Sequence, residues 1–306
     1  MTKGLFRQDH PYLFGLIVLG GMAMIFWVGV AFFISHLVHP TASDLFNHKN
    51  GIGVIDLKGI MLTSEEVLAN LAEFRQDKNI KAVIIRIDSP GGAVGAAQEI
   101  YQDIKRTSKV KPVVASMASV AASGGYYAAI GATKIFANPG TMTGSIGVII
   151  KFANLEKILS IIGYQAEVIK SGINKDIGSF SRAMTAAERE LLQTMIDNVH
   201  NQFIQAIATE RKLGVELVRP MADGRIFTGS QAKDLGLIDH LGNFTDAVDQ
   251  AMILAGLEGE QPNLIYPEAK NFSFIDMLVS EKAQSLIKLL QPNPVSLMYQ
   301  WNPSVQ

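Results

Sequence analysis

The chain has 306 residues, of which 48 % are hydrophobic and only 18 % are charged. Its 27 basic residues balance 28 acidic ones, so the sequence lacks the basic excess of a nucleic-acid-binding surface, and no nucleic-acid partner is expected. Because there is no cysteine, disulfides, thiolate catalysis and cysteine-ligated metal or iron–sulfur sites are excluded. The positive mean hydropathy indicates either a large apolar core or a segment that lies in lipid.

Much of the apolar excess lies near the N-terminus. Residues 13–35 form an uncharged run which, at about 1.5 Å per residue, can cross the roughly 30 Å hydrocarbon core of a bilayer. Lys3 and Arg7 precede it, so the positive-inside rule places residues 1–12 in the cytoplasm and the rest of the chain outside it. The run is longer than the apolar core of a signal peptide. We therefore expect an uncleaved, single-pass anchor in contact with the lipid of the cytoplasmic (inner) membrane.

The remainder divides into three parts. Residues 36–50 show no periodicity and are interpreted as a linker, whereas residues 51–258 alternate between predicted strands and helices. The predicted strands cover 52–57, 80–88, 111–117, 134–139, 140–150 and 164–171, and the predicted helices cover 63–76, 93–107, 155–163, 185–212, 214–222 and 244–256. This alternation predicts an α/β domain with βαβ crossovers. Residues 259–306 are interpreted as a weakly organised C-terminal extension with one amphipathic helix over 274–290.

Two glycine-rich turns follow buried strands, DSPGG at 88–92 and ASGGYYAA at 122–129. Ser123 would project its hydroxyl at the start of a helix, either as a plain N-cap or as a nucleophile. The backbone amides of Gly92 and Gly124 could converge beside it and form an oxyanion hole. The neighbouring tyrosines, Tyr126 and Tyr127, are expected to pack in the core.

The residues do not by themselves identify a base for Ser123. Only His200 and His240 lie in the predicted globular part, so a metal cluster is not expected and a Ser–His–Asp triad has few candidates. A lysine could act as the base if burial lowered its pKa. The lysines within reach in sequence are Lys134, Lys151, Lys157, Lys170 and Lys175.

The motifs DSPGG, ASGGYY, TGSIGV and KSGINKDIGS together resemble the signal peptide peptidase family of bacterial membrane-bound Ser/Lys proteases, in its short form. The resemblance covers residues 52–243 and implies the Clp protease/crotonase-like fold of repeated ββα units. It implies Ser123 as the nucleophile and Lys175 as the general base, with no cofactor and no metal. Gly92 and Gly124 match the oxyanion amides, and Ser145 matches a hydroxyl that orients the lysine. One catalytic repeat implies that identical subunits assemble into a homo-oligomer.

Three functions are compatible with these observations. The first is a membrane-anchored serine endopeptidase that degrades hydrophobic peptides such as cleaved signal peptides, cutting after small or apolar residues in a groove walled by residues 89–95 and 140–147. The second is a crotonase-like acyl-CoA enzyme, against which the anchor and the lack of an evident basic patch for coenzyme A count. The third is a catalytically inactive membrane scaffold with the same fold.

Overall fold

The structure is a computed structural model that describes residues 11–38, 50–268 and 298–301. The chain divides into two units, residues 1–49 and 50–306. In the first unit, α2 (Pro11–Val38) is an uninterrupted helix, and its stretch Phe14–Phe33 is long and apolar enough to cross a membrane. The predicted helix 274–290 and most of the predicted linker lie outside the described residues.

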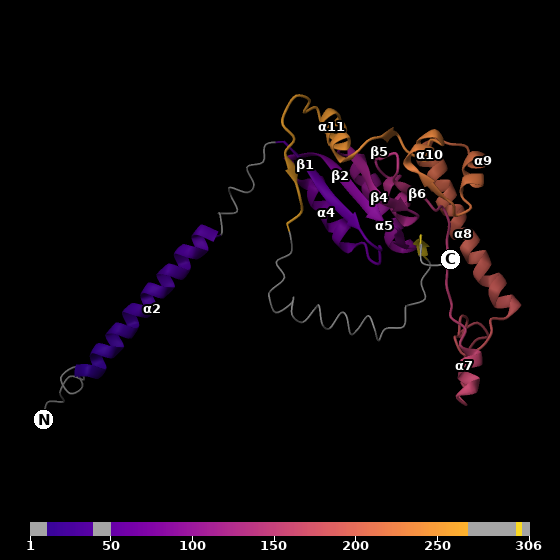
Figure 1. Ribbon diagram of the computed structural model, residues 1–306, viewed down its shortest axis with the longest axis horizontal. Coiled ribbons are helices and arrows are strands. Elements are labelled where there is room, and N and C mark those ends of the chain that lie inside the picture. Colours follow the sequence, from indigo (N-terminus) through magenta and orange to yellow (C-terminus); the bar gives the residue numbers. More distant parts are fainter. Residues whose placement is uncertain (1–10, 39–49, 269–297, 302–306) are drawn as a thin grey trace. The chain divides into compact units, whose positions relative to one another are not determined.

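The second unit is built on an eight-stranded sheet (Figure 1). Its strands are β1 (Gly51–Lys58), β2 (Ile80–Ser89), β4 (Val113–Ala122), β5 (Lys134–Ala137), β6 (Met142–Gly144), β7 (Ile226–Thr228), β8 (His240–Leu241) and β9 (Leu264–Ile265). The main path runs β7-β6-β4-β2-β1-β9, while β5 pairs with β4 and β8. Every pair is parallel except β6 with β7. This arrangement confirms the α/β fold.

The described helices of this unit are α4 (Glu65–Gln76), α5 (Val94–Ser108), α6 (Gly124–Ala129), α7 (Glu156–Ile161), α8 (Ala186–Arg211), α9 (Val215–Val218), η1 (Arg219–Met221), α10 (Gly229–Asp234) and α11 (Phe244–Leu254). Those that pack on the sheet lie on both of its faces. The central strand β2 is buried on both faces, as its nearly continuous apolar sequence requires. Ile85 and Ile87 join the core under α4, α5 and α6, whereas Ile84 packs on the opposite face with residues of α11.

Two predicted elements differ from the structure. Residues 164–170 are not a strand but an irregular, exposed segment between α7 and α8, because they pair with no other strand. The predicted strand 140–150 is reduced to β6, and beyond it Ile149 makes only an isolated bridge. Both segments are rich in the β-branched residues that favour strands. Composition alone does not form a strand where no second strand is available for pairing.

The predicted C-terminal extension is partly integrated into the second unit. β9 pairs with β1 at one edge of the sheet, and β10 (Met298–Gln300) forms a separate two-stranded sheet with β3 (Gly91–Ala93). Residues from both strands therefore contribute to the unit that was predicted to end near residue 258. Tyr299 of β10 is fully buried in the core.

The helix α8 has two unequal halves. It begins at a capping box: the Thr185 hydroxyl accepts from the Glu188 N–H, and the Glu188 carboxylate accepts from the Thr185 N–H. Its second half packs into the core through Phe203, Ile204 and Ile207, whereas Glu188 is the only buried residue of its first half. The first half therefore leads away from the sheet toward the irregular segment and α7 (Figure 1).

One buried hydrogen bond anchors α6 to the rest of the unit. The Tyr126 side chain is fully buried, and its hydroxyl donates to the Leu237 carbonyl oxygen at 2.9 Å. Replacing Tyr126 by phenylalanine would leave that buried carbonyl unpaired. We expect Tyr126→Phe to lower the free energy of unfolding by about 1–3 kcal/mol in denaturant titrations. The exposed Tyr164 offers a matched control, and an equal loss in Tyr164→Phe would contradict this role.

Candidate active site

Ser123 occupies the turn that joins β4 to α6. Its backbone has φ 53° and ψ −115°, although it is not a glycine, and its side chain is almost fully buried. Its N–H donates to the Gly144 carbonyl oxygen at 2.8 Å, and its own carbonyl accepts from the Tyr127 N–H at 2.8 Å. A non-glycine residue in this region costs about 1–3 kcal/mol and persists only where its surroundings impose it. Such a strained strand-to-helix turn is also how hydrolases present a nucleophilic serine.

The two amides that the sequence predicted to converge lie side by side. A β-carbon on Gly124 would lie 3.2 Å from the Gly92 amide nitrogen, and a β-carbon on Gly91 would lie 2.7 Å from the Gly124 amide nitrogen. The Gly124 amide follows Ser123 directly in the chain, so both amides are adjacent to the serine. Two N–H groups in this arrangement can stabilise the negative oxygen of a tetrahedral intermediate. Their catalytic role stays a prediction.

Met61, which the sequence analysis missed, holds the strand β3 in place. Its N–H donates to the Gly91 carbonyl at 3.0 Å, and its carbonyl accepts from the Ala93 N–H at 2.7 Å. Backbone groups alternate between the two edges of a strand, so these bonds leave the Gly92 N–H on the opposite edge. A β-carbon on Gly92 would meet the Met61 carbonyl oxygen at 2.0 Å, which is too close. Nothing in the sequence distinguishes Met61 from an ordinary core methionine.

Ser145 is a neighbour of Ser123. Ala122 and Gly144 are register partners in the parallel pair β4–β6. Ser123 and Ser145 directly follow these partners on the two adjacent strands. Ser145 also has a positive φ, 49°, and its N–H donates to the Arg225 carbonyl at 2.7 Å. The structure thus brings four of the five predicted site residues together, namely Ser123, Gly92, Gly124 and Ser145.

The fifth residue, Lys175, is exposed on the irregular segment between α7 and α8. Within the described part of the chain, no hydrogen bond or ion pair engages its ammonium group or the Ser123 hydroxyl. The alternative lysine on this segment is occupied, because Lys170 donates to the Ile173 carbonyl at 3.0 Å and to the Asp176 carboxylate at 2.5 Å. Of these two lysines, Lys175 is therefore the one free to engage another surface.

An ion-pair network fixes the base of the segment that carries Lys175. Arg182 donates to the Asp176 carboxylate at 3.0 Å and to both carboxylate oxygens of Glu188. Hydrogen bonds from Arg182 and Lys170 hold the pKa of Asp176 well below its usual range. Hydrogen bonds from Arg182 and from the Thr185 backbone lower the pKa of Glu188 to about 2. The segment is thereby tied to the capping box of α8.

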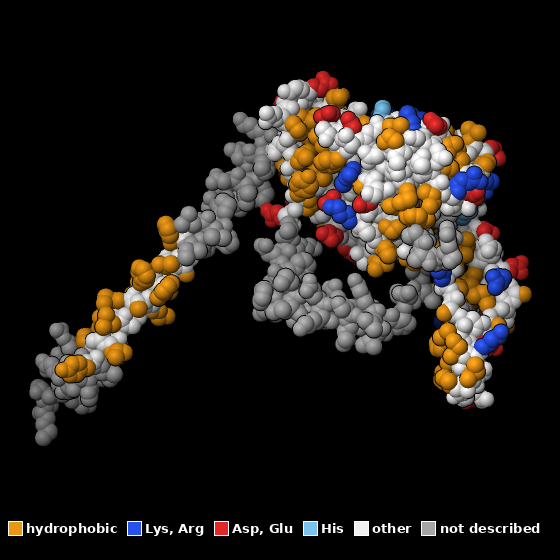
Figure 2. Space-filling model, viewed as in Figure 1, with side chains coloured by type: hydrophobic (Ala, Val, Ile, Leu, Met, Phe, Trp, Pro, Cys, Tyr) orange, Lys and Arg blue, Asp and Glu red, His pale blue; other side chains and the backbone are white. Residues whose placement is uncertain are grey.

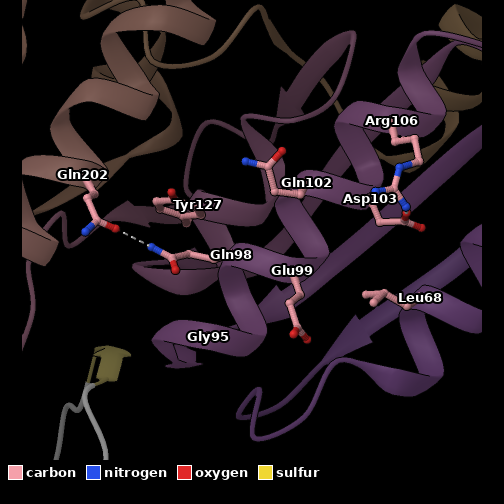
Figure 3. A pocket seen from close by; sticks show the side chains of 9 residues that line it. All are labelled: Leu68, Gly95, Gln98, Glu99, Gln102, Asp103, Arg106, Tyr127 and Gln202. Atoms are coloured by element: carbon pink, nitrogen blue, oxygen red, sulfur yellow. Dashed lines mark hydrogen bonds and ion pairs between the residues drawn. The ribbon is translucent and has the colours of Figure 1, made fainter.

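A hollow of about 580 Å³ lies between α5 and α8 (Figure 3). Tyr127 forms part of its wall, and Gln98 on α5 donates to Gln202 on α8 at 3.0 Å across it. Its other lining side chains are mostly polar, including Glu99 and Gln102. Of the walls predicted for a substrate groove, residues 89–95 and 140–147, only Gly95 lines this hollow, so the apolar groove stays a prediction. In the described residues, no group of three or more His, Asp or Glu side chains could hold a metal ion.

Comparison with known proteins identifies the family. The model of peptidase family S49 matches residues 105–258, and the Clp protease model matches residues 58–143. The chain belongs to peptidase family S49. The match to the Clp protease model agrees with the mixed α/β sheet and confirms the predicted fold class.

Several relatives of this S49 chain carry protease names. A Synechocystis protein named as a protease is 49 % identical over 62 % of this chain and 68 % of its own length. A protein of Enterococcus faecium named as signal peptide peptidase SppA is 35 % identical over 60 % of this chain and 54 % of its own length. Protease 4 of Salmonella typhi is 33 % identical over 81 % of this chain and 41 % of its own length. The family and these names support a serine peptidase, and an N-terminal apolar helix fits a membrane-anchored one.

The crowding at Gly92 predicts a specific loss of activity. In Gly92→Ala the new methyl group would displace the backbone of β3 or Met61 and move the Gly92 amide away from Ser123. We expect kcat for peptide hydrolysis to fall by about 100-fold, the usual effect of losing one oxyanion donor. Gly95 in the first turn of α5 has open space around it, so Gly95→Ala is the matched control and should retain activity. Equal activities of the two variants would contradict the oxyanion assignment.

The ion-pair network should hold residues 170–182 in their folded conformation more firmly at neutral pH than in acid. Because the pKa values of Asp176 and Glu188 are lowered by folding, their contribution is complete above about pH 4.5 and is lost as the pH falls toward 2. Arg182→Gln should speed amide hydrogen exchange of this segment at pH 7, measured by mass spectrometry. Arg189→Gln, on the exposed face of α8, should not. If wild type and Arg182→Gln exchange equally at pH 7, the network does not hold the segment.

Proposed function

We propose that the chain is a membrane-anchored serine endopeptidase in which Ser123 is the nucleophile and Lys175 the general base. The observation that carries the proposal is the strained Ser123 turn, placed beside the two convergent amides of Gly92 and Gly124. A nucleophile next to preorganised N–H donors is the arrangement that acyl transfer requires. Membership of peptidase family S49 favours peptide hydrolysis over the acyl-CoA chemistry considered from sequence.

In the proposed reaction, Lys175 takes the proton from the Ser123 hydroxyl as its oxygen attacks the carbonyl carbon of a peptide bond. The carbonyl oxygen becomes negative and accepts hydrogen bonds from the Gly92 and Gly124 amides. Lys175 then returns the proton to the leaving amine, which leaves an ester on Ser123. Water, activated by the same lysine, hydrolyses this ester and regenerates the serine. The Ser145 hydroxyl, one strand away, orients the lysine.

We propose that Lys175 reaches Ser123 from a neighbouring copy of the chain in a homo-oligomer. Lys175 is exposed and lies on a segment with many exposed apolar side chains: Ile158, Ile161, Ile162, Val168, Ile169 and Ile173. Figure 2 shows orange apolar side chains gathered over the end of the molecule that carries α7. An apolar patch of this kind usually marks an interface. Docking it on a second copy would bury the lysine, and burial lowers a lysine's pKa so that it can accept a proton.

The proposed substrates are hydrophobic peptides, such as the signal peptides left in a membrane after cleavage. The support is the apolar helix α2, which would hold the catalytic unit close to the membrane surface, and the name of the Enterococcus faecium relative. The residues before α2 include Lys3 and Arg7, so we place the N-terminus in the cytoplasm and the catalytic unit on the outer side of the inner membrane.

Mixing two inactive variants tests the proposal directly. Ser123→Ala and Lys175→Ala should each lose several orders of magnitude in kcat, because members of a catalytic dyad act as a unit. If each site combines Ser123 of one copy with Lys175 of another, co-assembled mixtures of the two variants should recover a substantial part, about a quarter, of wild-type activity. Lys157→Ala, which alters another exposed lysine nearby, is the control and should stay active.

Two outcomes would contradict the proposal. Substantial activity in Lys175→Ala, above about a tenth of wild type, would remove this lysine as the base. Failure of the co-assembled mixture to recover activity, while both variants still oligomerise in light scattering, would show that the serine and the lysine do not come from different copies.

The pH profile provides an independent test of the base. A buried lysine must lose its proton before it can accept one, so kcat/KM should rise with pH and the enzyme should prefer alkaline conditions. The profile of Lys175→Arg should lose this ascending limb together with the activity. An optimum in acid, with a limb in the range of a carboxylate near pH 4, would indicate a different mechanism.

A further inference from the structure

Ser89 lies at the end of β2, directly before the turn that leads into β3, and its side chain is fully buried. Its hydroxyl donates to the Gly59 carbonyl oxygen at 2.6 Å and accepts from the Gly91 N–H at 3.1 Å. The one proton and one lone pair of this hydroxyl therefore join two chain segments that lie on either side of it. The sequence analysis singled out the DSPGG turn for its glycines and gave its serine no role.

Ser89 also touches the start of α6. A β-carbon on Gly125 would lie 2.9 Å from the Ser89 carbonyl oxygen and 3.6 Å from the Ser89 β-carbon. Gly125 directly follows Gly124, whose amide is one of the two proposed oxyanion donors. Ser89 is therefore in contact with the segments that carry both donors, because the other donor, Gly92, comes one residue after its partner Gly91.

The peptide group between Gly91 and Gly92 needs such support. Neither residue has a β-carbon, and Gly91 has a φ of 99°. Glycine adopts positive and negative φ values about equally well, so this peptide group can turn over at little conformational cost. A turned-over group would direct the Gly91 carbonyl oxygen, instead of the Gly92 N–H, toward the oxyanion. Hydrogen bonds have to fix the orientation that catalysis requires.

The hydroxyl of Ser89 fixes this orientation from two sides. It holds the Gly91 N–H directly. It also holds the carbonyl of Gly59, and two residues later the Met61 N–H donates to the Gly91 carbonyl at 3.0 Å. That bond points the Gly91 carbonyl toward Met61 and leaves the Gly92 N–H on the opposite edge of β3.

We propose that Ser89 is a positioning residue, whose buried hydroxyl keeps the Gly92 and Gly124 amides oriented toward the oxyanion. The proposal rests on the peptidase function above and adds a residue to its machinery. Ser89 is fully buried behind these amides, so it acts through them and not on the substrate. An interaction that matters only when the negative oxygen forms affects kcat and leaves KM nearly unchanged.

The experiment compares Ser89→Ala with Ser116→Ala in the full-length chain in detergent. Ser116 lies on the neighbouring strand β4, is equally buried, and its hydroxyl accepts from Arg86 at 2.8 Å. Each substitution removes one buried, hydrogen-bonded hydroxyl from the same sheet, so a general loss of stability should affect both variants. The values of kcat and KM are measured with a quenched-fluorescent peptide built of alanine and leucine.

We expect kcat of Ser89→Ala to fall by about 10- to 100-fold, up to the effect of losing one oxyanion donor, while KM changes by less than about twofold. Ser116→Ala should keep a kcat close to that of the wild type. Equal kcat values in the two variants would overturn the proposal. A loss that appears in KM with kcat intact would also overturn it, because Ser89 would then serve substrate binding.

Amide hydrogen exchange of residues 90–93, measured by mass spectrometry, tests the same role without a substrate. Exchange should be faster in Ser89→Ala than in the wild type and in Ser116→Ala, because the Gly91 N–H loses its acceptor. Equal exchange in all three chains would overturn the proposal whether or not the protein hydrolyses peptides. Faster exchange in Ser89→Ala, together with a wild type that cleaves no peptide, would support the hold of Ser89 on β3 and refute the peptidase function alone.

Discussion

The site depends on the absence of β-carbons where three chain segments meet. An added methyl group would collide with the Tyr299 backbone at Gly91 and with the Met61 backbone at Gly92. At Gly124 it would press on the end of the Met61 side chain and lie 3.2 Å from the Gly92 amide nitrogen. This close approach is what places two amide N–H groups next to Ser123, whose own backbone is held in a strained conformation. The folded unit must supply the energy that this turn costs, and it does so through buried packing of α6 and the β4–β6 ladder.

The proposed general base lies apart from the other proposed site residues. Ser123, Gly92, Gly124 and Ser145 converge at the ends of neighbouring strands, but Lys175 lies on an exposed segment held by the Arg182 ion pairs. A lysine kept in water until subunits assemble would make proteolysis conditional on assembly, since only burial allows it to act as a base.

The sequence predicted the elements whose residues show a clear period or cap. The buried strands around Ile84 and the helix that starts at Thr185 follow directly from their patterns. It also predicted the convergence of Gly92 and Gly124, because glycine turns after parallel strands lie at one edge of a sheet.

The rest required tertiary information. The segment 164–170 has the composition of a strand but finds no partner, and Met61 acquires its role only by lying next to β3. The pairing of Tyr299 with Gly92, about 200 residues apart in sequence, leaves no local pattern. The aromatic cluster of Tyr299 and Trp301 near the C-terminus was the one available hint, and aromatic residues that recur in an otherwise polar, proline-containing tail indicate that it packs somewhere.

The role of Ser123 as the nucleophile at the strained turn can be tested by covalent labelling of the full-length, assembled protein with a serine-reactive fluorophosphonate. Peptide mass spectrometry then locates the modified residue. We expect one adduct, on Ser123, and greatly slowed labelling in Lys175→Ala. An adduct on Ser145 instead, or no adduct on a folded and oligomeric protein, would contradict it.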